Sequence, residues 1–170
     1  MSAETIIALW KDARGGLIQE VEKIPEDRFS FRATPDTRSI AEVLQHIISA
    51  QKMLVGESCR PDANLMRQSF AAHQNEYGVG VNDVTDKKGL LDLLRSSMDE
   101  AATCISSYGD KLDEKMMGLT GQQISKSAFL TFALSHEMYH RGQLTVFERL
   151  LNIEPALTER FNKMIAASAG

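Results

Sequence analysis

Apolar residues recur at steps of three and four along the first 24 residues of the chain, which predicts a helix that buries one stripe. The stripe consists of Ile6, Trp10, Ala13, Leu17, Val21 and Ile24. Pro25 ends this helix because proline cannot continue the helical hydrogen-bond ladder. A second helix is predicted from a capping residue, Thr37 or Ser39, to about Gly56.

The segment 57–86 differs from both helices because proline, glycine, asparagine and aspartate interrupt it repeatedly. Only about 64–76 keeps a helical pattern, so we predict a long crossover with one helical island. Helical spacing returns over 90–107 and again over about 125–151. A short helix over about 156–165 completes the chain.

Four long amphipathic helices, with no alternation of apolar and polar residues, predict an all-α four-helix bundle, because each apolar stripe must be buried against the others. No repeat or linker marks a second domain, so we expect residues 1–170 to form one domain. The crossover of about 30 residues can run back along the bundle, which allows the second and third long helices to be parallel.

Composition and charge narrow the classes of function. With 43% hydrophobic residues in a chain of 170, the protein can bury a core of its own. The net charge of -4 and the lack of a basic run argue against nucleic acid as a partner, since that binding needs clustered lysine and arginine. No apolar stretch approaches the ~18 residues of a membrane span, and no basic signal segment is present. We therefore expect a cytoplasmic protein without a membrane partner.

The two cysteines, Cys59 and Cys104, form neither a CxxC pair nor a zinc-finger spacing. We expect two unpaired thiols in a reducing compartment, since nothing in the spacing supports a disulfide. Neither cysteine lies at ligand spacing from a histidine, so a reacting thiol would have to come from a cosubstrate.

The histidines carry the strongest chemical signal, because three of the four fall on stripes predicted to face the bundle interior. His136 and His140 lie one turn apart on the face that also carries Phe129, Ala133, Gln143, Leu144, Phe147 and Leu151. His46 shares a face of the second helix with Ser39, Glu42, Val43, Ala50 and Met53. One inward histidine is usually a core residue satisfied by hydrogen bonds, but three compete for the same few partners.

One divalent metal ion would accept a lone pair from all three imidazoles. A histidine pair on one helix and a third histidine from a facing helix leave one position for water or substrate, which is typical of catalytic zinc sites. We therefore predict a metal site formed by His46, His136 and His140, with zinc or nickel as the favoured ions. His73 lies in the crossover without a partner at ligand spacing and is expected on the surface.

Two segments resemble the DinB-like (YfiT-like) metalloenzyme family. Residues 39–47, SIAEVLQHI, are similar to the second helix of that family, and residues 135–143, SHEMYHRGQ, resemble its HxxxHRGQ signature. The resemblance covers nearly the whole chain and implies an up-down-down-up bundle in which the three inward histidines bind the metal. Arg38 stands where many members carry tryptophan.

The segment from His136 to His140 also matches HExxH, the zinc peptidase motif in which Glu137 would be the general base and Glu159 a third ligand. Such a peptidase needs a strand edge beside the helix to bind its substrate, and the sequence contains no convincing strand. Pro155 also interrupts the path to Glu159. We therefore rank a peptidase well below the three-histidine site. Glu137 could flank the site, but we expect it to be solvated.

Three further residues near the predicted ligands have open roles. Glu42, one turn before His46, could orient that imidazole, bind the metal or act as a base, or it could only favour the start of its helix. Gln143, one turn beyond His140, could hydrogen-bond a water or a substrate, or it could support one of the ligands or serve in packing. Arg141 projects off the ligand face and is expected in a structural ion pair or at the rim.

We expect a metal-dependent enzyme that acts on a small molecule. By the resemblance, the first candidate reaction is the transfer of a low-molecular-weight thiol such as mycothiol or bacillithiol, whereas activation of water would give a hydrolase. The alternative is a non-catalytic, stress-associated metal-binding bundle. The resemblance also implies a homodimer, and Ile7 and Leu9 widen the apolar arc of the first helix beyond one packing face.

Overall fold

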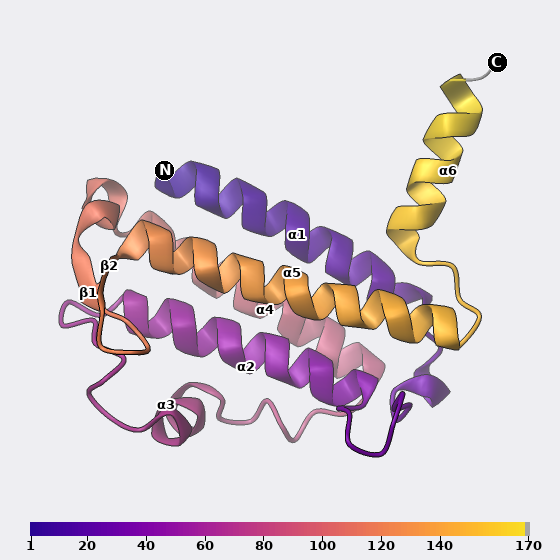
Figure 1. Cartoon of the computed structure of the whole chain (residues 1–170), viewed down its shortest axis with the longest axis horizontal. Coiled ribbons are helices and arrows are strands. Elements are labelled where there is room, and N and C mark those ends of the chain that lie inside the picture. Colours follow the sequence, from indigo (N-terminus) through magenta and orange to yellow (C-terminus); the bar gives the residue numbers. More distant parts are fainter. Residues whose placement is uncertain (169–170) are drawn as a thin grey trace.

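The computed structural model describes residues 1–168 and shows a bundle of four long helices (Figure 1). These helices are α1 (Ala3–Lys23), α2 (Ile40–Ser58), α4 (Lys87–Ser106) and α5 (Lys126–Leu150). The shorter elements are the 3-10 turns η1 (Glu26–Arg28) and η2 (Gly109–Asp113), the helices α3 (Phe70–Tyr77) and α6 (Ala156–Ser168), and the strands β1 (Lys115–Met117) and β2 (Gln123–Ser125).

The long helices follow the predicted up-down-down-up order. In Figure 1, α1 and α5 run in one direction and α2 and α4 in the opposite one. The crossover that contains α3 returns the chain, so that α4 begins at the same end of the bundle as α2. Both α1 and α2 pack against α4 and α5. The second and the last long helix therefore lie side by side, although a long stretch of chain separates them.

Side-chain caps set where the helices begin. Ser39 and Glu42 form a capping box, in which the Ser39 hydroxyl accepts from the Glu42 N–H and the Glu42 carboxylate accepts from the Ser39 N–H at 2.8 Å. Asp86 starts α4 by accepting a hydrogen bond from the Gly89 N–H at 2.8 Å. The helical island begins later than predicted, because Ser69 caps it and Leu65 instead donates its N–H to the β1 strand.

The predicted stripes form the core between the four long helices. One cluster of buried side chains includes Trp10, Met98 and Phe129, and a second, further along the bundle, includes Leu17 and Leu144. Trp10, Leu17 and Leu144 have no exposed surface. Burying side chains of this size contributes roughly 1.5–3 kcal/mol each, so packing of these stripes is the main favourable term that holds the bundle together.

A short hairpin corrects the expectation that the chain contains no strand. Strands β1 and β2 pair antiparallel, with Lys115 opposite Ser125 and Met117 opposite Gln123. Gly121 in the connection has φ of 78°, in the left-handed region that glycine adopts without steric cost. Strands of three residues are too short to show alternation, which explains why the pattern did not predict them.

The two cysteines are joined by a disulfide, so the expectation of two unpaired thiols is wrong. The Cα atoms of Cys59 and Cys104 are 6.2 Å apart. Cys59 follows the end of α2, and Cys104 lies in the last turn of α4. Because these two helices are parallel, their carboxyl ends meet, and the cysteines meet with them.

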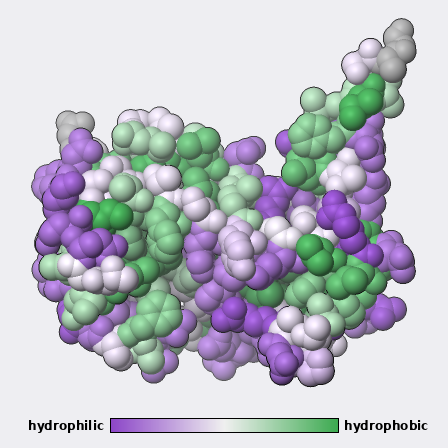
Figure 2. Space-filling view, in the orientation of Figure 1, coloured by the Kyte–Doolittle hydropathy of each residue, from purple (hydrophilic) through white to green (hydrophobic). Residues whose placement is uncertain are grey.

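Helix α6 projects from one end of the bundle (Figure 1). Its exposed apolar side chains are Leu157, Phe161, Met164 and Ile165. Figure 2 shows this apolar surface along the projecting helix. No helix among residues 1–168 combines the length and the apolar character needed to cross a membrane.

Candidate metal centre

The structure brings together the three histidines predicted as ligands. His46 comes from α2, and His136 and His140 lie one turn apart on α5, which packs beside α2. The Nε2 atom of His136 is 3.3 Å from that of His46 and 3.1 Å from that of His140. His140 is buried and the other two are half-buried, so solvent reaches the centre from one side.

The distances from the His136 Nε2 atom to the other two nitrogens are close to those between the ligands of a bound cation. Tetrahedral zinc with bonds of about 2.0–2.1 Å places its nitrogen ligands about 3.3 Å apart. The Nδ1 atom of His140 donates to the Gln143 Oε1 at 2.8 Å, which leaves the Nε2 lone pair of His140 free to bind. Hydrogen bonds among the three imidazoles cannot satisfy all three Nε2 atoms at once, because one proton is shared by only two nitrogens. These three histidines could therefore hold a metal ion.

The electrostatic environment keeps the imidazoles neutral. Burial lowers the pKa of His46 to about 4, and the positive charge of Arg38 adds to this effect. Burial is also the main cause that lowers the pKa of His136 and of His140. The hydrogen bond to Gln143 opposes the shift at His140. Neutral imidazole is the form that binds a metal, so the site is ready for one at neutral pH.

Glu137 is buried, which corrects the expectation that it is solvated. Its two carboxylate oxygens accept hydrogen bonds from the guanidinium of Arg14, each at 2.7 Å, and one also accepts from the Trp10 indole at 2.7 Å. Both partners lie on α1, so Glu137 faces that helix. A carboxylate with all these contacts cannot serve as the free general base that the HExxH motif requires.

Glu159 does not join the histidine centre either. It lies in α6, where its carboxylate pairs with Lys23 at 2.7 Å and with Lys163 at 2.5 Å. The structure thus gives the peptidase interpretation neither its base nor its third ligand. The three nitrogens from α2 and α5 remain as the ligand group that the described residues offer.

Glu42 and Arg141 both have structural partners. Glu42 closes the capping box of α2 and forms an ion pair with Arg32, which is the helix-start role rather than that of a ligand. Arg141 pairs with the buried Glu20 at 3.0 Å, as the expected structural ion pair. Its guanidinium lies so close to Gly16 that a Cβ there would come within 2.3 Å of it, so a larger residue at this position would displace the guanidinium.

His73 is fully buried, which corrects the expectation that it lies on the surface. Its Nδ1 is 3.5 Å from the Glu57 carboxylate, and its Nε2 is 3.2 Å from the carbonyl oxygen of Leu65. The ring also stacks on Tyr77, with ring centroids 6.4 Å apart. Helix α3 packs on α2, and this contact encloses the imidazole far from the other three.

Two hollows flank the histidine centre. One, of about 420 Å³, is lined by Arg38, Glu42, Gln45, His46, Ser49, Gln74, Asn75, Gly78 and Asn82. The other, of about 640 Å³, is lined by Asp36, Thr37, Arg38, Val43, Gln143, Val146 and Phe147. Both have the size of a small-molecule site.

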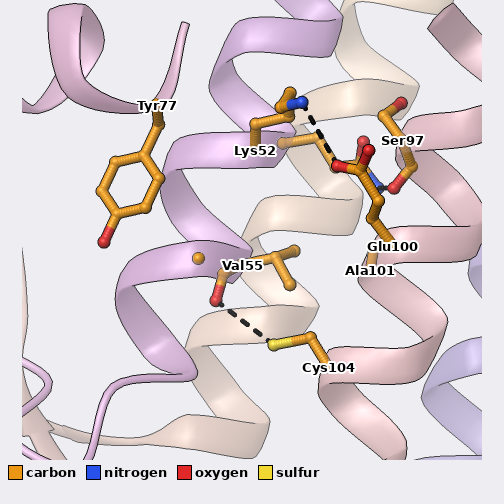
Figure 3. A pocket seen from close by; sticks show the side chains of 9 residues that line it. Lys52, Val55, Tyr77, Ser97, Glu100, Ala101 and Cys104 are labelled. Atoms are coloured by element: carbon orange, nitrogen blue, oxygen red, sulfur yellow. Dashed lines mark hydrogen bonds and ion pairs between the residues drawn. The ribbon is translucent and has the colours of Figure 1, made fainter.

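A third hollow, of about 190 Å³, lies between α2 and α4 and contains none of the three histidines. Figure 3 shows Lys52 and Glu100 facing each other across it, at 3.2 Å, with the sulfur of Cys104 below them. The Oε1 atom of the buried Gln51, which also lines it, has no hydrogen-bond partner among the described residues.

Comparison with known proteins identifies the family. The sequence profile described as the DinB family matches residues 1–167. The chain belongs to the DinB family. The uncharacterized protein YjoA of Bacillus subtilis (strain 168) is 23% identical over 130 residues, which cover 75% of this chain and 77% of YjoA.

Solved structures of DinB-like proteins share the fold. A DinB-like protein from Bacillus cereus ATCC 10987 has a TM-score of 0.71 at 18% identity, covering 91% of this chain and 95% of that one. YfiT from Bacillus subtilis has a TM-score of 0.69 at 15% identity and covers 89% of each chain. YfiT is described as a probable metal-dependent hydrolase with an unusual four-helix bundle topology.

Two other structures of this fold bear on partners. The mycothiol-dependent maleylpyruvate isomerase has a TM-score of 0.62 at 12% identity, covering 85% of this chain and 61% of its own. The colibactin self-resistance protein ClbS, with a TM-score of 0.65 at 15% identity and coverage of 87% and 96%, is solved in complex with double-stranded DNA. This complex overturns the expectation that nucleic acid is excluded as a partner, because net charge describes the whole chain and not one face of it.

Proposed function

We propose that this DinB-family protein is a metal-dependent enzyme that transfers a small thiol, or water, to a small-molecule electrophile. The observation that carries the proposal is the convergence of three neutral imidazoles, with Nε2 atoms 3.1 and 3.3 Å apart, beside two open hollows. In this proposal His46, His136 and His140 hold zinc or nickel. The bound ion would supply positive charge that lowers the pKa of a thiol or a water at its open position.

The chain's own residues support a thiol that comes from a cosubstrate. Cys59 and Cys104 are joined to each other, so neither is available as a nucleophile. Gln143 orients His140 and also lines the larger hollow, where Val43, Val146 and Phe147 offer apolar contacts for the electrophile. The description of one structural neighbour as mycothiol-dependent, and of another as a probable metal-dependent hydrolase, supports both versions of the reaction.

The experiment is a titration of the cobalt-substituted protein, after elemental analysis has measured its metal content. Addition of a small thiol such as 2-mercaptoethanol should produce a new charge-transfer band, whereas ethylene glycol, which carries a hydroxyl instead, should not. Hydrolysis of an activated ester without any thiol effect would assign the reaction to water. A protein that holds stoichiometric metal but responds to neither probe would be the non-catalytic bundle.

We also propose a homodimer. Leu9 is 49% exposed on α1, and α6 exposes the apolar side chains Leu157, Phe161, Met164 and Ile165. A two-fold contact would bury the same apolar patch on both subunits. Sedimentation at micromolar concentration tests this, since a mass near the 18.9 kDa of one chain would contradict it.

The cytoplasm stays the proposed location. The disulfide between Cys59 and Cys104 does not itself support this location, since disulfides are rare in reducing compartments. Alkylation of thiols before the cells are opened, followed by mass spectrometry of both peptides, measures the state of the two cysteines. Two unmodified, bonded cysteines would contradict a cytoplasmic location.

A further inference from the structure

The acidic residues near the histidine ligands in the sequence offer no free negative charge to balance a bound cation. The two carboxylates nearest in sequence to the histidines are each neutralised by an arginine: Glu42 pairs with Arg32, and Glu137 with Arg14. A divalent ion held there would therefore have no negative protein ligand beside it.

Arg38 adds a further positive charge at this place. It lies directly before the capping residue Ser39 of α2, and its side chain lines both hollows that flank the centre. His46 lines the first of these hollows as well, so the Arg38 guanidinium and that imidazole share one cavity.

Arg38 also differs from the other arginines around the bundle core in having no partner. Arg14, Arg32 and Arg141 each pair with a carboxylate. Within residues 1–168 the guanidinium of Arg38 takes part in no hydrogen bond and no ion pair, and it is exposed to the solvent of the hollows. Five donors in a planar fork are thus available to a ligand.

The hollow that Arg38 shares with His46 suits an anionic ligand. Apart from Glu42, whose charge Arg32 balances, its polar lining consists of neutral amides and a hydroxyl, from Gln45, Ser49, Gln74, Asn75 and Asn82. The exposed Asp36 lines the other hollow only. Within the hollow shared with His46, a carboxylate beside Arg38 would therefore meet no unpaired negative charge.

We propose that Arg38 binds a carboxylate group of the substrate or thiol cosubstrate in the hollow it shares with His46. This inference rests on the proposed function, in which His46 is one of the metal ligands. It names the substrate class as organic carboxylates. A planar guanidinium recognises a carboxylate with two parallel hydrogen bonds, so it selects both charge and shape.

Calorimetric titration of the zinc-loaded protein with succinate, and with its neutral analogue succinamide, tests the proposal. Succinate should bind the native protein, and Arg38→Gln should weaken this binding by about tenfold or more, because it removes a charge-assisted pair. The affinity of Arg38→Lys for succinate should lie between those of the native protein and of Arg38→Gln. Arg28→Gln is the matched control, since Arg28 is an exposed arginine outside both hollows and should leave the affinity unchanged.

Three outcomes would overturn the proposal: no binding of succinate to the native protein, equal affinity in the Arg38→Gln variant, or equal weakening of succinate and succinamide. Zinc content is measured in parallel on every sample. If the native protein holds no zinc, the proposed function fails, but the effect of Arg38→Gln on succinate binding is still measured on that protein. If zinc is held and the variant binds succinate normally, only the role of Arg38 fails.

Discussion

The Nδ1 atom of His140 donates a hydrogen bond to the Oε1 atom of Gln143 at 2.8 Å. Because an amide oxygen only accepts, this contact fixes the proton on Nδ1 and directs the lone pair of Nε2 toward His46 and His136. Gln143 thereby orients the imidazole of His140 without contributing an atom to the ligand group itself. Its position one turn beyond His140 makes it a positioning residue for the proposed ligand.

Gln143→Leu should lower zinc affinity by about 10–100-fold, as loss of an orienting partner does at histidine metal sites. Gln143→Glu should keep most of the affinity because a carboxylate also accepts from Nδ1. Competition with a chromophoric chelator measures both. Gln19→Leu, at an exposed glutamine of α1, is the control and should behave as the native protein. Unchanged affinity in Gln143→Leu would remove this role.

Alanine at His46, His136 or His140 should abolish retention of the metal, because two imidazoles bind far more weakly than three. His73→Ala is the informative contrast. It should retain the metal but lose stability, since the variant leaves a buried cavity beside Glu57. Elemental analysis and thermal unfolding separate the two effects. Full metal content in the His46→Ala protein would contradict the three-histidine site.

Glu137→Gln should lower the free energy of unfolding by about 3–5 kcal/mol, because it leaves the buried Arg14 guanidinium without a counter-charge. Replacing both residues by methionine should cost less than this single change. Urea denaturation measures the difference, and metal content should stay at the native level. A variant of native stability that had lost only a hydrolytic activity would instead support Glu137 as a general base.

The free energy of unfolding should depend on pH through Glu148. Burial, with the negative charge of Glu20 as second cause, raises the pKa of Glu148 to about 8 in the folded protein. The unfolded chain releases this proton near its ordinary value, so the stabilisation present at low pH is lost as pH rises from about 4.5 to about 8. Up to roughly 4 kcal/mol is involved.

Glu148→Gln should therefore be more stable than the native protein above pH 8 and should gain little at pH 5. Denaturation curves at the two pH values measure the difference. Glu22→Gln, at an exposed glutamate of α1, is the control and should show no such trend. A constant difference between the Glu148→Gln and native proteins at both pH values would contradict the raised pKa.

The disulfide should stabilise the protein by about 4 kcal/mol, the loop-closure value for a separation of 45 residues. Reductant should lower the midpoint of urea unfolding of the native protein. Cys104→Ser should unfold at that lower midpoint with or without reductant. If reductant shifts both proteins equally, the effect does not come from this bond.

The sequence predicted the bundle and its order because these depend on local patterns. Steps of three and four placed Trp10 and Leu17 inside, and Ser39 and Glu42 carried the capping signal of α2 in four consecutive positions. Three histidines on apolar stripes were enough to bring the candidate centre together. Helical spacing put Gln143 one turn from His140, but the sequence left the role of Gln143 open and did not predict the hydrogen bond between them.

What the sequence did not predict depends on pairings between distant segments. Glu137 is buried because the guanidinium of Arg14, which lies beside the apolar stripe of α1, forms a buried ion pair with it. His73 is buried because α3 docks on Glu57. The disulfide could have been predicted from two facts considered together. The second and third long helices were expected to be parallel, and Cys59 and Cys104 lie at the carboxyl ends of these two helices.

The long crossover also decides when the histidine centre can form during folding. His46 and His136 are 90 residues apart in the chain, and they meet only after α2 and α5 have docked across the finished bundle. Closing so large a loop costs conformational entropy before any contact compensates for it. We therefore expect His46 to meet His136 among the last tertiary contacts to form. The complete three-nitrogen group therefore exists only in the folded chain. A metal ion that needs all three nitrogens would bind this folded arrangement alone, so its supply would raise the folded fraction as well as load the site.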